Sequence, residues 1–304
     1  MNAVFIIDKP SGLTSHDVVN RVRRILGERS VGHLGTLDPL ATGVLPLVAG
    51  NLTRLAQFYT ASEKTYEGTI RFGFATDTYD AEGEPTTPAQ SVVLDRGQLD
   101  AVAPRFRGVI EQMPPPFSAK KIHGVPAYKL ARKKKEVSLA PVQVQIKSFE
   151  IMSCEDDMAT FRAHVASGTY MRCVAHDFGR ELGCGAHLAW LRRTRVAEFD
   201  IADAHTLAEL ESASRQGSVE DLAVHPRQLL PQMPSLTASE EIAASVRSGR
   251  AVNLPDFSRA KQVKVFYGQS ELIAIATRVA GTLFHPRIVL APEASLQSVA
   301  PAGR

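Results

Sequence analysis

Hydrophobic and polar residues follow two different periods along the first part of the chain. Residues 4–8 (VFIID) are almost continuously apolar, which predicts a short buried strand. Thr14 and Asp17 then have the spacing of a helix capping box, and apolar residues recur every three or four positions as far as Leu26. This pattern predicts an amphipathic helix that ends at Gly27.

Strands and helices continue to alternate as far as residue 230. Alternating apolar and polar positions indicate half-buried strands, and two such segments flank the acidic turn EDD as an antiparallel pair would. Two other segments have helical spacing and are followed by glycines. The sequence therefore predicts strands over residues 65–76, 142–153 and 158–167 and helices over residues 99–106 and 171–182.

The character of the chain changes past Leu230. A proline-containing linker, PQMPSL, leads to a small amphipathic helix over residues 239–247. Three short strands follow (QVKVFYG, ELIAIATRVA and LFHPRIVL), and the turns between them contain glycine. We therefore predict two domains, a main domain over residues 1–230 and a small β-rich domain over residues 231–304.

Composition places the protein among soluble globular proteins. The chain has 304 residues, 44% of them hydrophobic, and no apolar stretch approaches the length needed to span a membrane. The N-terminus lacks a basic segment and a small-residue cleavage site, and three cysteines cannot all pair. We therefore expect a cytoplasmic protein, and the lack of a coiled-coil pattern favours a monomer.

Charge is segregated along the chain, although the net charge is only +3. Residues 113–137 are proline-rich at first and then strongly basic, which is typical of a long loop or arm outside the core. Acidic residues gather elsewhere, as in residues 77–84. Such segregation suits a surface that binds a polyanion, although a single basic run is equally consistent with solvated surface.

Residues 32–43 (GHLGTLDPLATG) contain the strongest candidate for chemistry. Asp38 precedes a proline and lies among three glycines, which permit unusual backbone conformations and close approach of a ligand. His33 lies five residues before it. An isolated Asp-Pro pair usually caps a helix or marks a turn, and this alternative stays open beside a catalytic carboxylate.

Two residues further along, one basic and one aromatic, have both a functional and a structural interpretation. Arg172 begins a predicted helix directly after Tyr170, and it would hold the Asp38 carboxylate ionised and oriented if the two met. It is equally consistent with an RNA-contacting or surface arginine. Tyr66 has the shape to stack on a base, but a strand tyrosine is more often structural. We expect Trp190 in the core.

The chain lacks the usual motifs for nucleotide triphosphates, dinucleotides, zinc proteolysis and serine hydrolysis. Two Cys-x-x-His pairs superficially resemble a zinc site, but the first falls within a predicted helix and finger spacings are missing. We favour packed thiols and surface or capping histidines at these positions, and we expect catalysis without metal or cofactor. The two pairs are Cys173 with His176 and Cys184 with His187.

Four blocks in this order resemble the bacterial tRNA pseudouridine-55 synthases of the TruB type. The blocks are IIDKPSGLTSHD (6–17), GHLGTLDPLATGVLPL (32–47), KTYEGTIRFGFATDTYDAEG (64–83) and SGTYMRCVAHDFGRELGCGAHLAWLRRT (167–194). The resemblance covers residues 4–200, and residues 114–132 are similar to the RNA-gripping insertion of that family. The C-terminal part resembles, more weakly, the PUA-like domain that such enzymes append.

The resemblance implies an α+β fold and an isomerase. The fold would have a central mixed, largely antiparallel sheet flanked by helices, followed by the β-rich PUA-like domain. The activity would be an intramolecular transfer at uridine 55 in the T stem-loop of tRNA, in which the N1–C1′ bond breaks and the uracil rejoins the ribose through C5. The family requires no cofactor, and the basic insertion would contact phosphates.

The resemblance also assigns roles to residues of this chain. Asp38 matches the catalytic aspartate, either as a nucleophile or as a base at the ribose, and Arg172 matches its partner. Tyr66 matches the tyrosine that stacks on the flipped base and helps to remove its C5 proton. The remaining assignments are His33 in the space left by the flipped base, Tyr170 and Leu191 along the uracil pocket, and Lys9 with Pro10 in support of the site.

Two alternatives belong to other classes of function. The first is an RNA-binding or tRNA-folding module in which the loop around Asp38 is only structural. The presence of Asp38, Tyr66 and Arg172 together argues against it. The second is a zinc-dependent nucleic-acid enzyme built on the two Cys-x-x-His pairs.

Overall fold

The structure is a computed structural model that describes residues 1–115, 121–122, 125–126 and 140–291. Most of the basic part of the predicted arm over residues 113–137 therefore lies outside the described residues. Among the described residues, no helix is both long enough and apolar enough to cross a membrane.

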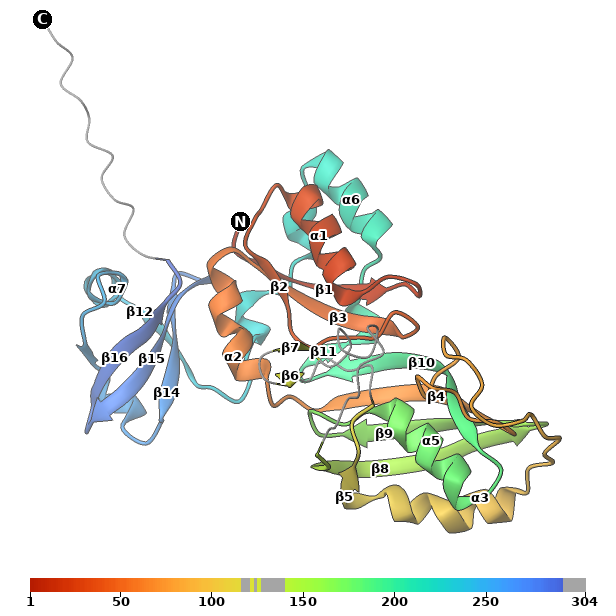
Figure 1. The fold of residues 1–304 in the computed structure, drawn as a ribbon. Helices are drawn as coiled ribbons and strands as arrows, with labels where there is room; N and C mark the ends of the chain where they lie inside the picture. Colours follow the sequence, from red (N-terminus) through yellow and green to blue (C-terminus); the bar gives the residue numbers. More distant parts are fainter. Residues whose placement is uncertain (116–120, 123–124, 127–139, 292–304) are drawn as a thin grey trace, which may run out of the picture.

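The main domain is built on one mixed sheet (Figure 1). Its strands follow the order β1-β3-β10-β4-β9-β8-β5, with β2 beside β3 and β11 beside β10, and every pairing is antiparallel except that of β3 with β10. The strands are β1 (Ala3–Lys9), β2 (Val31–His33), β3 (Thr42–Ala49), β4 (Lys64–Phe72), β5 (Gly108–Gln112), β8 (Val142–Glu155), β9 (Met158–Val165), β10 (Ala186–Val196) and β11 (Phe199–Asp200). Two short strands, β6 (Lys121–Ile122) and β7 (Val125–Pro126), pair with each other.

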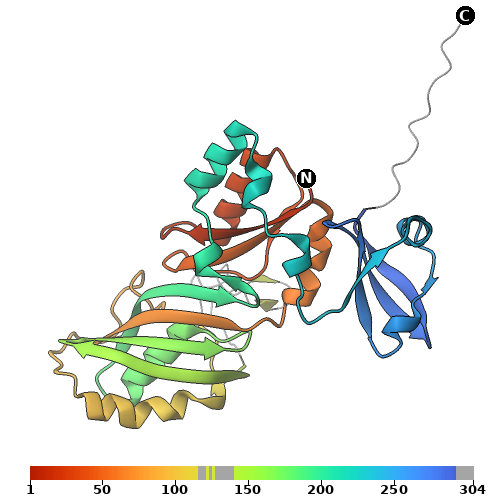
Figure 2. The same ribbon diagram turned by 180° about the vertical axis from the view of Figure 1, so that it is seen from behind.

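Helices lie along this sheet in two groups (Figures 1 and 2). The first group, α1 (Ser15–Leu26) and α6 (Leu207–Gln216), packs together near β1 and β3. The second group, α5 (Met171–Glu181) and α3 (Arg96–Val102), covers β4, β8, β9 and β10. A four-residue helix, α2 (Ala56–Tyr59), follows β3. The combination confirms the predicted α+β class with a mixed, largely antiparallel sheet.

The sequence patterns account for several of these elements. The Thr14 side chain accepts a hydrogen bond from the Asp17 backbone while the Asp17 carboxylate accepts one from Thr14, so the predicted capping box is present. Gly27 ends α1 in the left-handed conformation, as predicted. Strand β4 alternates between buried and half-buried residues, which directs its even-numbered side chains toward α5 and the core.

The parallel pairing of β3 with β10 is short and close. Arg192 and Arg193 of β10 pair with Thr42 and Gly43 of β3. Gly43 has a φ of 99°, and a Cβ atom there would lie 2.2 Å from the Arg193 carbonyl oxygen. Only glycine therefore permits this junction, which joins the strand after the Asp38 loop to the centre of the sheet.

A second sheet forms the C-terminal part, with the order β12-β14-β15-β16-β13. It lies beside the main domain near α2, and Figure 2 shows the same arrangement from behind. The predicted helix and three strands are all present. The elements are β12 (Ser235–Ala238), α7 (Glu240–Arg247), β13 (Val252–Asn253), β14 (Gln262–Tyr267), β15 (Glu271–Ala280) and β16 (Leu283–Val289).

Two details differ from the predictions. Strand β4 ends at Phe72 rather than at residue 76, because Gly73 has a φ of 105° and turns the chain. Trp190 is 40% exposed, so its predicted place in the core is wrong. The pairing of β10 with β4 shifts register between Leu188 and Trp190, which places Trp190 opposite Thr69 on the face turned away from the core.

Candidate active site

Asp38 lies in the loop between β2 and β3, which the N-terminal segment holds in place. The Ser15 hydroxyl donates to the Leu37 carbonyl (3.0 Å) and accepts from the Leu37 amide (2.8 Å). The Gly12 amide donates to the Pro39 carbonyl at 2.9 Å. Both neighbours of Asp38 are therefore bound, while its own side chain remains 40% exposed. The loop presents the carboxylate on a fixed backbone.

Lys9 also stabilises the Asp38 loop, through hydrogen bonds to backbone carbonyls. Its buried ammonium donates to the carbonyls of Pro10 (2.9 Å), Leu13 (2.6 Å) and Pro39 (3.1 Å). Burial lowers the pKa of Lys9 to about 8, and the attraction of Asp38 opposes that shift. Lys9 thus holds the backbone beside Asp38, as the resemblance implies, without lining the cavity described below.

Arg172 is the ion-pair partner of the Asp38 carboxylate. Its Nε lies 2.9 Å from Asp38 Oδ2, and its side chain is only 6% exposed. Its Nη1 donates to the Thr78 carbonyl (3.2 Å) and lies 3.5 Å from Asp80 Oδ2. The guanidinium therefore bridges an accessible carboxylate and a buried one. Of the interpretations that the sequence left open for Asp38, this geometry favours an oriented, charge-assisted pair over a helix cap.

Asp80 is a site residue that sequence reasoning missed. Its side chain is 4% exposed and accepts hydrogen bonds from the Thr78 hydroxyl (2.5 Å) and the Glu82 amide (3.1 Å). By composition, residues 77–84 are only an acidic loop. The signal that singles out Asp80 is its position inside the block over residues 64–83, together with the need for a buried partner on the far side of Arg172.

These groups surround one cavity of about 260 Å³. Five of the residues assigned from the sequence line it, although they come from four separate segments of the chain. Its walls combine three cations, two phenol rings and several aliphatic side chains. The lining is Gly35, Thr36, Leu37, Asp38, Lys64, Tyr66, Gly168, Thr169, Tyr170, Met171, Arg172, Leu191 and Arg193.

His33 lies outside this cavity. It is the last residue of β2, half-buried, and five residues before Asp38. Burial lowers its pKa, with smaller contributions from Arg193 and His16, so the ring is neutral at pH 7. Among the described residues its Nδ1 has no hydrogen-bond partner. A neutral imidazole suits contact with bases more than contact with phosphates.

Lys64 and Arg193 also line the cavity, although neither was assigned to the site from sequence patterns or from the resemblance. Burial lowers the pKa of Lys64 to about 8, with a contribution from Arg193, and its ammonium donates to the Ser62 carbonyl at 2.6 Å. Arg193 is wholly buried. Three cations thus face the region between Asp38 and Tyr66, and the arrangement can bind an anionic or polar ring system while keeping one carboxylate accessible.

The two Cys-x-x-His pairs are occupied in other contacts. Cys173 is buried and its thiol contacts the Met113 carbonyl, while His176 stacks on Tyr79 with ring centroids 3.9 Å apart. His187 Nδ1 is bonded to the Phe74 carbonyl at 3.1 Å. In the part of the chain that the structure describes, no three His, Cys, Asp or Glu side chains gather as metal ligands would.

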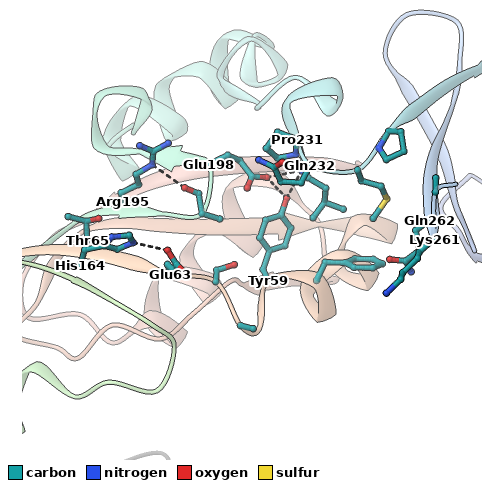
Figure 3. Close-up of a pocket in the computed structure, with 18 of the residues that line it drawn as sticks. Tyr59, Glu63, Thr65, His164, Arg195, Glu198, Pro231, Gln232, Lys261 and Gln262 are labelled. Atoms are coloured by element: carbon teal, nitrogen blue, oxygen red, sulfur yellow. Dashed lines mark hydrogen bonds and ion pairs between the residues drawn. The ribbon is translucent and has the colours of Figure 1, made fainter. Parts of the chain in front are cut away.

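A larger cavity lies elsewhere, between the main sheet and the C-terminal sheet (Figure 3). It measures about 1340 Å³, and its lining includes Thr65, Glu198 and Lys261. Size would rank it first as a binding site, but it contains neither Asp38 nor Arg172. The small cavity is the candidate active site because it brings the accessible Asp38 carboxylate to a buried, oriented cation, Arg172.

Solved structures define the class of this fold. The matching chain in the crystal structure of a Cbf5-Nop10-Gar1 complex has a TM-score of 0.71 over 95% of this chain and 85% of that chain, at 24% identity. A chain from the archaeal box H/ACA sRNP Nop10-Cbf5 complex has a TM-score of 0.69 over 95% of this chain and 86% of its own. The fold is therefore the pseudouridine synthase fold.

Sequence comparison narrows the class. Residues 23–171 match the TruB family pseudouridylate synthase N-terminal domain, and residues 172–232 match the tRNA pseudouridylate synthase B C-terminal domain. The tRNA pseudouridine synthase B of Solibacter usitatus is 48% identical over 95% of this chain and 100% of its own length. That of Aquifex aeolicus is 38% identical over 95% and 100%. The chain belongs to the TruB family.

Proposed function

We propose that this protein converts uridine 55 in the T loop of tRNA to pseudouridine. The observation that carries the proposal is the pairing of accessible Asp38 with buried Arg172, next to Tyr66, in a cavity of about 260 Å³. Membership in the TruB family supports the same reaction. The proposal also agrees with the basic segment at residues 120–135, since a tRNA substrate is a polyanion.

The reaction begins with removal of the target uridine from its stack, which is least costly for a loop base. The N1–C1′ bond then breaks with the help of the Asp38 carboxylate, acting as a nucleophile or as a base at the ribose. The detached uracil rotates and its C5 forms the new bond to C1′. The C5 proton leaves and N1 gains a proton, so the product is an isomer of the substrate.

Neighbouring residues have positional roles in this proposal. Arg172 orients the Asp38 carboxylate, and Asp80 holds Arg172 from the buried side. Tyr66 stacks on the uracil while it is detached and assists loss of the C5 proton. Tyr170 and Leu191 enclose the base, and the remaining assignments, Lys9 beneath the loop and His33 in the space left by the base, follow the family resemblance.

We extend the proposal to the rest of the chain. The substrate region is the T stem-loop, held by the insertion over residues 113–137, and the domain over residues 231–304 is a PUA-like RNA-binding domain. The protein acts as a monomer in the cytoplasm and uses no cofactor. The β-rich sheet of the C-terminal part supports the second of these assignments.

The decisive experiment treats unmodified tRNA with the purified protein and maps pseudouridine by carbodiimide-dependent primer-extension stops. We expect one stop at position 55, and we expect Asp38→Asn to abolish it while tRNA binding persists. Asp157→Asn is the matched control, because Asp157 pairs with Arg71 away from the cavity. Normal turnover by Asp38→Asn would refute the catalytic role of Asp38, a wild type that binds tRNA without modifying it would leave only an RNA-binding role, and a stop at another uridine would refute the position.

A further inference from the structure

Arg193 is, with Lys9, one of two charged residues of the described main domain that have no exposed surface. Its side chain has no measurable exposure, although arginine is seldom fully buried. It lies at the centre of the sheet, where β10 pairs with Gly43 of β3 on one side and with Tyr66 of β4 on the other. The residue therefore stands between the strand that follows the Asp38 loop and the strand that carries the stacking tyrosine.

The guanidinium binds the catalytic loop at three points. Its Nε donates to the Val44 carbonyl (2.8 Å), its Nη1 to the Thr36 carbonyl (3.1 Å) and its Nη2 to the Gly35 carbonyl (3.0 Å). Gly35 has a φ of 121°, a conformation that side chains other than glycine rarely adopt. Arg193 thus fixes an unusual turn two and three residues before Asp38.

The same guanidinium also interacts with Tyr66. Burial lowers the pKa of Arg193, and the interaction with the Tyr66 hydroxyl and the attraction of Asp38 oppose this shift. Among the described residues, no carboxylate forms an ion pair with Arg193. A buried cation bound by carbonyls and a phenol, with the Asp38 carboxylate acting on it only through space, costs free energy that an aliphatic side chain in the same position would not.

We infer that Arg193 is a positioning residue for the proposed reaction, because it fixes the Asp38 loop and the Tyr66 ring in one frame. Ser15 and Lys9 hold the loop from the N-terminal side, whereas Arg193 is the contact that relates it to β4. The inference rests on the proposed function, since it gives a role to the relative placement of these two groups.

Arg192 is the matched control on the same strand. It is half-exposed and its guanidinium binds both oxygens of Asp8, at 3.1 and 2.7 Å, rather than the Asp38 loop. Replacing either arginine by lysine keeps the charge and loses the multi-point hydrogen bonding. A general effect of disturbing β10 should therefore appear in both variants, whereas loss of positioning should appear only in Arg193→Lys.

The test compares Arg193→Lys with Arg192→Lys in single-turnover assays on tRNA, below the melting temperature of each variant. We expect Arg193→Lys to lower the rate constant roughly 100-fold, the scale expected when a catalytic group is misplaced by about 1 Å, with the Kd for tRNA changed less than about threefold. We expect Arg192→Lys to remain within about twofold of the wild type. A full rate in Arg193→Lys would overturn the inference.

A double-mutant cycle with Tyr66→Phe separates positioning from general stability. If part of the effect passes through the tyrosine hydroxyl, Arg193→Lys should slow Tyr66→Phe less than it slows the wild type. If the rate losses of the two single variants simply multiply in the double variant, Arg193 acts through the Asp38 loop alone. If they multiply and the hydrogen–deuterium exchange of that loop is also unchanged in Arg193→Lys, the inference is overturned.

Hydrogen–deuterium exchange gives a readout that does not depend on activity. We expect the amides of residues 35–41 to exchange faster in Arg193→Lys than in Arg192→Lys. If the wild type modified a different uridine, or none, the proposed function would fail while this difference in exchange would still be expected. Equal exchange in the two variants would overturn the positioning role by itself.

Gly35→Ala perturbs the contact between Arg193 and the Asp38 loop from the loop side. It tests the positioning role even if Arg193→Lys does not fold. The added Cβ would lie 3.7 Å from Arg193 Nη1 at the strained φ of 121°, and the buried arginine stays intact. We expect its rate to fall roughly tenfold at unchanged tRNA affinity. A wild-type rate in Gly35→Ala would show that the geometry held by Arg193 is not needed.

Discussion

Strand β4 separates two cavities that differ in almost every property. Lys64 and Tyr66 line the cavity of about 260 Å³ around Asp38, whereas Thr65, between them in sequence, lines the cavity of about 1340 Å³ beside the C-terminal sheet (Figure 3). Alternation along one strand is enough to assign neighbouring residues to different sites. The smaller cavity contains the groups that suit chemistry.

The two cavities differ in how their charged side chains are bound. Around Asp38, a buried arginine is fixed by Asp80 and Thr78, so the charges are oriented before a substrate arrives. In the larger cavity the carboxylates are bound to local partners, since Glu198 accepts from Tyr59 and Glu63 pairs with His164. Oriented charge in a confined site, rather than volume, is what stabilises a transition state.

The largest expected effect belongs to Arg172. We expect Arg172→Lys to lower the single-turnover rate on tRNA by 10²–10³-fold, because a lysine cannot contact Asp38, Asp80 and Thr78 at once. Arg195→Lys in the larger cavity is the control, with an expected change within about twofold. Equal losses in the two variants would remove the distinction between the cavities.

The next effect concerns the pH dependence of stability and Lys9. Its pKa is about 8 in the folded protein against 10.5 ordinarily, so between these values the unfolded state binds more protons. Stability should therefore rise with pH through this window and fall as pH drops from 10.5 to 8. The full shift corresponds to at most about 3 kcal/mol.

Urea unfolding of the wild type and of Lys9→Met across this pH range measures the contribution of Lys9 to the free energy of unfolding. Lys64 also has a pKa of about 8, so the wild type contains both contributions and only the difference between the two proteins isolates Lys9. We expect the free energy of unfolding to rise less steeply with pH in Lys9→Met. Parallel pH profiles would mean that Lys9 is not the buried cation that supports the Asp38 loop.

Tyr59 provides the corresponding test in the larger cavity. Its hydroxyl donates to Glu198 Oε1 at 2.5 Å, and the Leu230 amide donates to the same oxygen at 2.9 Å. Burial, followed by the effect of Glu198, raises the pKa of Tyr59, so the phenol stays protonated as a donor. We expect Tyr59→Phe to cost about 1–2 kcal/mol in urea unfolding and to leave turnover unchanged.

Tyr267→Phe is the control for Tyr59→Phe. It keeps the ring over the Arg247 guanidinium, so its cost should stay under about 0.5 kcal/mol. If Tyr59→Phe instead lowered the rate with no loss of stability, the larger cavity would take part in the reaction and the comparison would need revision.

The sequence predicted the parts of the fold that depend on local patterns. The capping box of α1, the strand pair β8–β9 and the three C-terminal strands all follow from periodicity and turn residues over short windows. The sequence pattern singled out Asp38 and raised a pairing with Arg172, but the assembly of the whole site was available only through the resemblance, because the cavity joins segments as distant as Asp38 and Leu191. Periodicity contains no information about which segments meet.

Sequence patterns missed Asp80 and Arg193 and misplaced Trp190 for one physical reason. Asp80 and Arg193 matter because they are buried and charged, yet in the sequence they belong to an acidic loop and a basic run that resemble solvated surface. Trp190 is the reverse case, since a register shift exposes a residue whose type predicts burial. Each depends on a strand register or a distant partner that composition cannot show.

The smallest expected effect tests whether the larger cavity contributes to RNA binding at all. Arg259 and Lys261 are exposed at its edge in the C-terminal domain. If both contact phosphates, the double variant Arg259→Ala/Lys261→Ala should weaken tRNA binding only about threefold, because exposed charges contribute little individually. The slope of log Kd against log salt concentration should nevertheless fall by about 1 for each residue.

The control is Arg250→Ala, which removes an exposed arginine of the same C-terminal part outside the cavity and should leave this slope unchanged. Because the rate at saturating tRNA should not change in either variant, a loss of rate would contradict the division of labour between the cavities, and an unchanged salt dependence would confine RNA binding to the main domain.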